Sequence, residues 1–177
     1  MSRARRGIST LNPVRDHPPA SDGGLTLTWY ARPVTDERPV LVTGVFDLMH
    51  VGHVRFLTSA REAGAALVVG VEDDARVRAW KGPARPIVPD HERAEVLSAL
   101  KAVDGVFLVH GPPEVNSADA YATLLAPLHP AVLAYTQGDR FAEQRRRGAE
   151  DMGAKPYEIP FVPGRSTSLI LQRLGTS

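Results

Sequence analysis

The chain contains no cysteine, few aromatic residues and no large excess of either charge. Of its 177 residues, 6% are aromatic, and 21 Lys and Arg stand against 20 Asp and Glu, which gives a formal net charge of +1. The missing thiols exclude disulfide scaffolds, thiolate zinc sites, iron–sulfur clusters and cysteine nucleophiles. The charge balance argues against a polybasic nucleic-acid binder. Together these absences favour one globular domain in a reducing compartment, and we expect a cytoplasmic protein.

Long hydrophobic runs are also missing. No apolar run approaches the roughly 18 residues that a membrane helix needs, and no apolar stretch follows the basic first residues, so neither a membrane span nor a secretory signal is expected. Residues 1–38 are rich in Arg, Pro, Ser, Asp and Gly and show no long period, which is typical of an extension. Within it, Leu25–Tyr30 alternates apolar and polar residues and predicts a short strand. Trp29 and Tyr30 are expected to pack on the domain or on a second subunit.

From residue 39 to 177, short apolar runs alternate with segments of helical character. The expected strands are residues 40–43, 66–71, 106–109, 131–135 and 157–162. The expected helices are residues 52–63, 90–101, 117–125, 140–152 and 166–175, and Asp90, Ser117 and Ser166 are the expected N-caps of three of them. The strands are continuously apolar, which is typical of a parallel sheet covered on both faces. We therefore predict an α/β domain with a Rossmann-like parallel five-stranded sheet and helices on both faces. Ligands bind such sheets outside the carboxyl ends of the strands, at the switch point.

The connection after the first of these strands holds the most informative residues. It reads Gly44-Val45-Phe46-Asp47-Leu48-Met49-His50-Val51-Gly52-His53 and leads into a helix. A helix N-terminus attracts phosphate, a glycine lets a ligand approach the backbone, and histidines donate hydrogen bonds to phosphate oxygens. The two histidines could instead be core residues that form hydrogen bonds with the backbone. They could also be metal ligands, with Asp47 as the third ligand. The coincidence of strand, glycine turn and His-x-Gly-His at a switch point favours phosphate binding.

This signature resembles that of the cytidylyltransferase-like nucleotidyltransferases, and the resemblance extends from about residue 39 to 174. Gly164-Arg165-Ser166-Thr167-Ser168 resembles the family's Ser-Thr-Thr segment before the last helix, with Ser168 in place of the final Thr. The block from Lys81 to Ile87, followed by Arg93, resembles the family's lysine loop and arginine. Gln137-Gly138-Asp139-Arg140 resembles a Gly-Asp segment that faces the nucleotide in relatives.

The resemblance implies attack of a phosphorylated small-molecule acceptor on a nucleoside triphosphate, with release of pyrophosphate and assistance from Mg²⁺ or another divalent cation. It implies catalytic roles for His50, His53 and Lys81. The nucleotide-binding residues that it implies are Gly44, Val45, Phe46, Asp47, Gly52, Arg93, Gly138, Asp139, Arg165, Ser166, Thr167 and Ser168. Asp47 either orients a site residue or helps to place the metal, and no metal ligand is assigned. A homodimer is a further expectation from the family.

The resemblance also bears on the substrates. Cytidylyltransferases acting on alcohol phosphates carry Arg-Thr-x-Gly before the Ser-Thr-Thr segment, whereas this chain has Phe161-Val162-Pro163-Gly164. Adenylyltransferases of the heptose-1-phosphate type lack that arginine and share Lys-Gly-x-x-Arg-Pro-Ile with residues 81–87. These features favour ATP and a sugar 1-phosphate. The alternatives are a CTP-dependent enzyme acting on an alcohol phosphate or phosphonate, and a non-catalytic nucleotide-binding module.

A cluster of arginines near the C-terminus raises the question of nucleic-acid binding. It consists of Arg140, Arg145, Arg146 and Arg147. Three adjacent arginines point around a helix rather than along one face, and only Phe141 offers a stacking ring. We therefore expect a solvated helix or a rim that attracts an anionic substrate, and no nucleic-acid partner.

Overall fold

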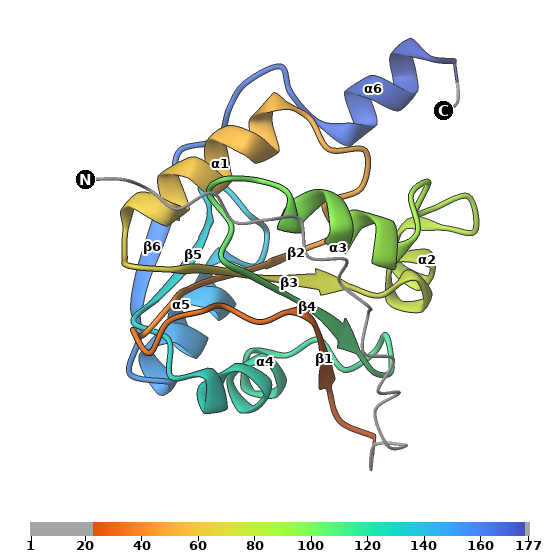
Figure 1. Ribbon diagram of the computed structural model, residues 1–177. Coiled ribbons are helices and arrows are strands. Elements are labelled where there is room, and N and C mark those ends of the chain that lie inside the picture. The colour runs from red at the N-terminus through yellow and green to blue at the C-terminus, as the bar shows by residue number, and fades with distance from the viewer. Residues whose placement is uncertain (1–22, 176–177) are drawn as a thin grey trace.

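The computed structural model describes residues 23–175, in which strands and helices alternate along the chain (Figure 1). The strands are β1 (Thr26–Ala31), β2 (Val40–Gly44), β3 (Leu67–Glu72), β4 (Gly105–His110), β5 (Val132–Thr136) and β6 (Lys155–Ile159). The helices are α1 (Val51–Glu62), α2 (Asp74–Lys81), α3 (Asp90–Ser98), α4 (Ala118–Leu125), the 3₁₀ turn η1 (Ala126–Leu128), α5 (Ala142–Asp151) and α6 (Thr167–Arg173). The predicted α/β class is confirmed.

The sheet has six strands in the order β1-β4-β3-β2-β5-β6. The strands β2 to β6 are parallel to their neighbours, and β1 pairs antiparallel with β4. The five predicted strands are the parallel strands β2 to β6, and the short strand predicted at Leu25–Tyr30 adds a sixth, β1. The sixth comes from the segment interpreted as an extension, because β1 covers the open edge of β4 and its Trp29 ring meets Phe107 edge-on at 5.6 Å. The chain reverses its direction across the sheet between β2 and β5, which is the switch point.

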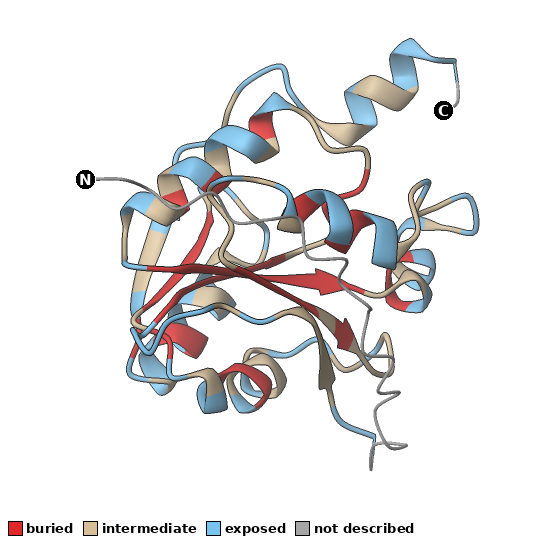
Figure 2. Cartoon of the chain, in the orientation of Figure 1, coloured by how far each residue is buried: buried red, intermediate tan, exposed pale blue. Residues whose placement is uncertain are grey.

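Helices cover both faces of the sheet, and each face has its own apolar core (Figures 1 and 2). Buried side chains of α1 and α3, such as Leu57 and Leu97, pack with Val40 and Val42 of β2 on one face. On the other face, α4 and α5 pack on a core that includes Leu41 of β2. The alternation of β2 between the two cores explains why its sequence is continuously apolar. Trp29 and Tyr30 likewise pack on opposite faces, so both contact the domain itself.

The boundaries of several elements differ from those expected. Helix α2 was not predicted, because its exposed surface is polar and only Arg76 and Val77 are buried, so no apolar stripe marks it. Helix α3 has Pro89 rather than Asp90 at its N-cap. The predicted caps Ser117 and Ser166 are confirmed, since each hydroxyl oxygen accepts a backbone N–H of the following turn. Among the described residues, no helix combines the length and apolar character needed to cross a bilayer.

A substitution in the centre of the sheet tests the packing between β3 and β4. A Cβ atom at Gly70 would lie 2.6 Å from the Phe107 ring and 3.0 Å from Thr43 Cγ2, and Phe107 is fully buried. Gly70→Ala should therefore lower the free energy of unfolding by about 1–3 kcal/mol through overpacking. Urea denaturation measures this, with Gly24→Ala as the matched control, because that site has open space around it. Equal stability of the two variants would contradict the packing described.

Candidate functional site

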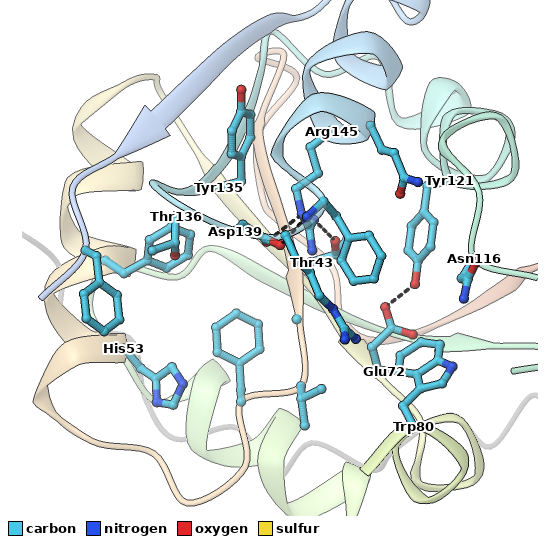
Figure 3. Close-up of a pocket in the computed structure, with 18 of the residues that line it drawn as sticks. Thr43, His53, Glu72, Trp80, Asn116, Tyr121, Tyr135, Thr136, Asp139 and Arg145 are labelled. Carbon is cyan, nitrogen blue, oxygen red and sulfur yellow. Dashed lines mark hydrogen bonds and ion pairs between the residues drawn. The ribbon is translucent and has the colours of Figure 1, made fainter. Parts of the chain in front are cut away.

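A cavity of about 620 Å³ opens at the carboxyl ends of β2, β3 and β5 (Figure 3). Thr43, Glu72 and Thr136 line it from the ends of these three strands. The start of α1, the end of α2, side chains of α4 and α5, and the segment before α6 also line it. The cavity therefore lies at the switch point where the sequence predicted a ligand site.

His50 and His53 lie at the start of α1 with their rings stacked, 4.0 Å between centroids. His50 Nδ1 accepts the Gly52 N–H at 3.1 Å, and His53 Nδ1 accepts the His50 N–H at 3.3 Å. Because each Nδ1 is an acceptor, a neutral ring carries its proton on Nε2. A Cβ atom at Gly52 would lie 2.9 Å from the His50 ring, so the glycine allows the ring to reach the backbone. The motif thus presents two Nε2–H donors of fixed tautomer to the cavity.

Both imidazoles are held in the neutral form. Burial lowers the pKa of His53 to about 4, and the neighbouring His50 adds to the effect while Asp47 opposes it. Burial, followed by the charge of Arg165, also lowers the pKa of His50. Neutral rings donate hydrogen bonds from Nε2 at neutral pH without carrying a charge. An anion bound beside them would favour their protonated forms.

Asp47 is almost completely buried and fastens two loops together. Its carboxylate pairs with the Arg85 guanidinium at 2.7 Å and accepts the backbone N–H groups of Ile87 and Val88. Burial by itself would raise the pKa of Asp47, but these hydrogen bonds and the Arg85 charge outweigh it and hold the pKa below its usual value. The backbone carbonyl of Asp47 accepts the Thr167 hydroxyl at 2.8 Å. Of the two roles left open by the sequence, orienting neighbouring segments is the one that these contacts perform.

Lys81 and Arg93, which resemble the family's lysine and arginine, lie in different places. Lys81, the last residue of α2, lines the cavity, and burial followed by the charges of Arg85 and Arg140 lowers its pKa. Arg93 is buried, and the structure does not bring it to the cavity. Its guanidinium pairs with Asp74 at 2.6 Å and donates to the carbonyl of Val45. Arg93 therefore supports the loop after β2 from behind, rather than facing a ligand.

The segment before α6 borders the cavity with Arg165, Ser166, Thr167 and Ser168. Ser166 Oγ accepts the Leu169 N–H and keeps its own proton to donate. The Thr167 hydroxyl is already used on Asp47, so this side chain joins α6 to the loop after β2. Arg165, Ser166 and Ser168 are thus the side chains of this segment with donors to offer a ligand.

The remaining predicted residues lie on or near the same cavity. Gly44, Val45 and Phe46 line it, with the Phe46 ring against His53 at 5.6 Å between centroids. Asp139 lines it as well, whereas Gly138 is not among the lining residues. Arg145, expected on a solvated helix or a rim, lines the cavity and pairs with Asp139 at 3.0 Å. Arg146 and Arg147 are exposed, with acidic partners on the surface.

The sequence did not reveal the cluster at the end of β3. Glu72 is buried, accepts the Tyr121 hydroxyl at 2.5 Å and pairs with Arg76 at 2.8 Å. The Arg76 guanidinium lies 4.6 Å from the Trp80 ring centre. The available signal was an acidic residue closing an otherwise apolar strand, with an arginine four residues later. Burial raises the pKa of Glu72, and the partners Tyr121 and Arg76 partly offset this.

The chain offers no dedicated cage for a divalent cation within residues 23–175. No group of three acidic or histidine side chains is gathered there, and the Asp47 carboxylate is already filled by Arg85 and backbone donors. Mg²⁺ commonly keeps several waters and binds through substrate phosphates.

The low pKa of His53 predicts an acid dependence of stability. Because the unfolded chain binds the proton near pH 6.5 and the folded chain only near pH 4, the contribution of His53 is present above pH 6.5 and is lost between those values. Urea denaturation at pH 7.5 and pH 5.0 measures the free energy of unfolding that is lost on acidification. This loss should be smaller in His53→Asn than in the parent protein, and the variant keeps an acceptor for the His50 N–H. His91→Gln, at an exposed site, is the control. An unchanged loss in His53→Asn would contradict the burial effect.

Comparison with known proteins finds a matching family model and several similar proteins. Residues 41–113 match the sequence model of the cytidylyltransferase-like family. The bifunctional protein HldE of Methylobacillus flagellatus is 39% identical over 143 residues, which are 79% of this chain and 28% of that protein. HldE of Geotalea uraniireducens is 38% identical over 143 residues, with 79% and 27% covered. The chain thus spans little more than a quarter of the curated relatives it matches.

Two solved structures have a similar fold. The lipopolysaccharide core biosynthesis protein from Thermoplasma volcanium has a TM-score of 0.56 and 26% identity, over 71% of this chain and 97% of that one. The pantoate-beta-alanine ligase from Francisella tularensis also has a TM-score of 0.56, at 13% identity over 76% of this chain and 62% of that one, which shows likeness of fold alone. Residues 41–113, which carry the His-x-Gly-His motif at the switch-point cavity, are thus cytidylyltransferase-like in sequence.

Proposed function

We propose that the chain is a nucleotidyltransferase that transfers AMP from ATP to a sugar 1-phosphate, with a heptose 1-phosphate as first candidate, and releases pyrophosphate. The observation that carries the proposal is the fixed pair of Nε2–H donors on His50 and His53 beside a large cavity. The 39% identity to an HldE protein and the resemblance to heptose-1-phosphate adenylyltransferases support the choice of substrates.

The reaction needs little acid–base chemistry from the protein. An oxygen of the acceptor phosphate forms a bond to the α-phosphorus of ATP, and the bond from that phosphorus to the oxygen bridging to the β-phosphate breaks. Pyrophosphate carries away the electron pair. The attacking oxygen is already anionic at neutral pH, so no general base is required. Catalysis then consists of alignment and stabilisation of the charge that develops on the phosphates.

The residues of the site suit that task. His50 and His53 would donate from Nε2 to the α-phosphate and the bridging oxygen, and Lys81 would neutralise the phosphates from the end of α2. Arg165 and the Ser166 hydroxyl would hold the leaving pyrophosphate at the other wall. The buried Asp47, joined to Arg85 and Thr167, would keep these segments at fixed spacing. A divalent cation would arrive with the triphosphate and neutralise part of its charge.

The preference for ATP rests on the residues that precede Gly164. Phe161 and Val162 line the cavity where cytidylyltransferases for alcohol phosphates carry Arg-Thr. Thr136 and Gln137 stand where the heptose-type enzymes have Lys-Gly before Gly-Asp. The second difference keeps CTP with an alcohol phosphate or a phosphonate as the alternative. The homodimer, the divalent cation and a cytoplasmic location with access to ATP are parts of the same proposal.

Pyrophosphate release from a panel of substrates tests the reaction. ATP and CTP are each combined with heptose 1-phosphate, glucose 1-phosphate, glycerol 3-phosphate and an alkylphosphonate, with and without Mg²⁺. ATP with heptose 1-phosphate should be fastest, and EDTA should stop the release. Preference for CTP with glycerol 3-phosphate would establish the alternative. No release from any pair would leave a non-catalytic module.

Two substitutions of His53 separate its donor from its role in the helix cap. His53→Asn keeps an acceptor near the position of Nδ1 and removes the Nε2–H, whereas His53→Gln keeps a donor near Nε2. His53→Asn should lower kcat by about 100- to 1,000-fold, and His53→Gln should lower it less. Thermal melting of both variants controls for the fold. Full activity of His53→Asn would remove His53 from the mechanism.

A further inference from the structure

The cavity has a second polar side that the proposed reaction has not yet used. Figure 3 shows Glu72, Trp80, Asn116 and Tyr121 gathered away from His53. We propose that this acceptor side binds the hydroxylated part of the acceptor, and that Arg145 binds the acceptor's phosphate. The inference rests on the proposed function for the identity of the acceptor, but it concerns the binding of a sugar phosphate and can be tested without turnover.

The Arg145 guanidinium is held in place by two hydrogen bonds, and its third nitrogen is left to bind a ligand. It reaches from α5, where Nε donates to Asp139 at 3.0 Å and Nη1 donates to Thr43 Oγ1 at 2.9 Å. Nη2 makes no hydrogen bond with any other residue of the described range 23–175, and the side chain lines the cavity. A planar guanidinium fixed at two of its nitrogens is preorganised for a phosphate oxygen at the third.

The position of Arg145 points to the acceptor rather than to the leaving group. Thr43 lies near the end of β2, the central strand of the three, between the end of β3 with Glu72 and the end of β5 with Thr136. The proposed pyrophosphate donors, Arg165 and Ser166, lie in the segment before α6. A phosphate attacking from the acceptor side must approach another anion, and a cation held between the two sides lowers that repulsion.

The acceptor side is rigid and suited to hydroxyl groups. Glu72 is fixed by Tyr121 and Arg76, and Trp80 is fixed by its Nε1–H bond to the carbonyl of Pro113 at 2.9 Å and by the Arg76 guanidinium against its ring. The Asn116 amide makes no hydrogen bond with any residue of the described part and lines the cavity. The Glu72 carboxylate and the Asn116 amide offer acceptors and a donor, and the rings of Trp80 and Tyr121 offer the apolar surface that a polyol needs.

Tryptophan fluorescence provides a binding measurement. Trp29 and Trp80 are the two tryptophans of the chain, and Trp29 packs on Phe107 at the far edge of the sheet. In the full chain carrying Trp29→Phe, titration with heptose 1-phosphate should change the emission of Trp80, and ATP alone should change it less. The same titration with glucose 1-phosphate and glycerol 3-phosphate covers other acceptors. No change with any of these compounds would overturn the proposal, whether or not pyrophosphate is released.

Substitution of Arg145 tests the phosphate contact. In the same background, Arg145→Gln should weaken binding of every phosphorylated acceptor by about 10- to 100-fold and leave the Kd of ATP, measured by calorimetry, within about twofold. Arg147→Gln on the same helix, an exposed site, is the control and should bind as the parent does. Loss of ATP affinity with unchanged acceptor binding would assign Arg145 to the triphosphate and overturn the inference.

Substitution of Asn116 tests the sugar contact. Asn116→Leu should weaken heptose 1-phosphate by about tenfold and glycerol 3-phosphate by less, because only the longer polyol reaches the amide. Arg145→Gln should not discriminate between the two. Equal losses for both acceptors in Asn116→Leu would contradict the assigned orientation. Melting curves of all variants show whether a loss of binding reflects a loss of fold.

Discussion

The buried carboxylate of Asp47 is the contact on which the site depends. Its partners Arg85, Ile87 and Val88 lie some forty residues away, and its carbonyl receives the Thr167 hydroxyl from the other end of the chain. Three segments that carry the proposed ligand contacts therefore meet at one residue. Arg93 supports the same loop through the carbonyl of Val45. Such doubly fixed loops can hold donors at the spacing that phosphoryl transfer requires.

The same loop keeps a conformation that it would not choose alone. Phe46 and Leu48 have φ values of 52° and 47°, in the left-handed region that non-glycine residues rarely adopt. A conformation of this kind persists only where its surroundings determine it, and here the contacts of Asp47 and the buried Phe46 ring do so. The result is that His50 enters α1 with its ring already over the Gly52 N–H. The contacts of Asp47 and Phe46 thus account for both the strained backbone of the loop and the fixed tautomer of the histidines.

The sequence predicted the parts of the molecule that depend on local pattern. Apolar strands, the capping serines Ser117 and Ser166, and the histidine motif all follow from neighbours in the chain. What could not be predicted depends on contacts between distant residues. Arg145 seemed part of a solvated arginine run, and only the approach of Thr43 brings it to the cavity. Arg93 matched a family position, yet Asp74 and two carbonyls occupy its guanidinium.

Electrostatics explain why a chain of nearly zero net charge suits a polyanion. The cations at the cavity, Lys81, Arg140, Arg145 and Arg165, come from segments far apart in the sequence, while much of the acidic charge lies elsewhere. The pKa values of His50 and His53 are lowered, so both rings are neutral at neutral pH. They therefore add hydrogen-bond donors without repelling these cations. A bound triphosphate would raise the pKa values of both histidines, because its negative charge favours their protonated forms. In the proposed reaction, the same arrangement of charge would therefore both bind the triphosphate and stabilise the phosphate that is transferred.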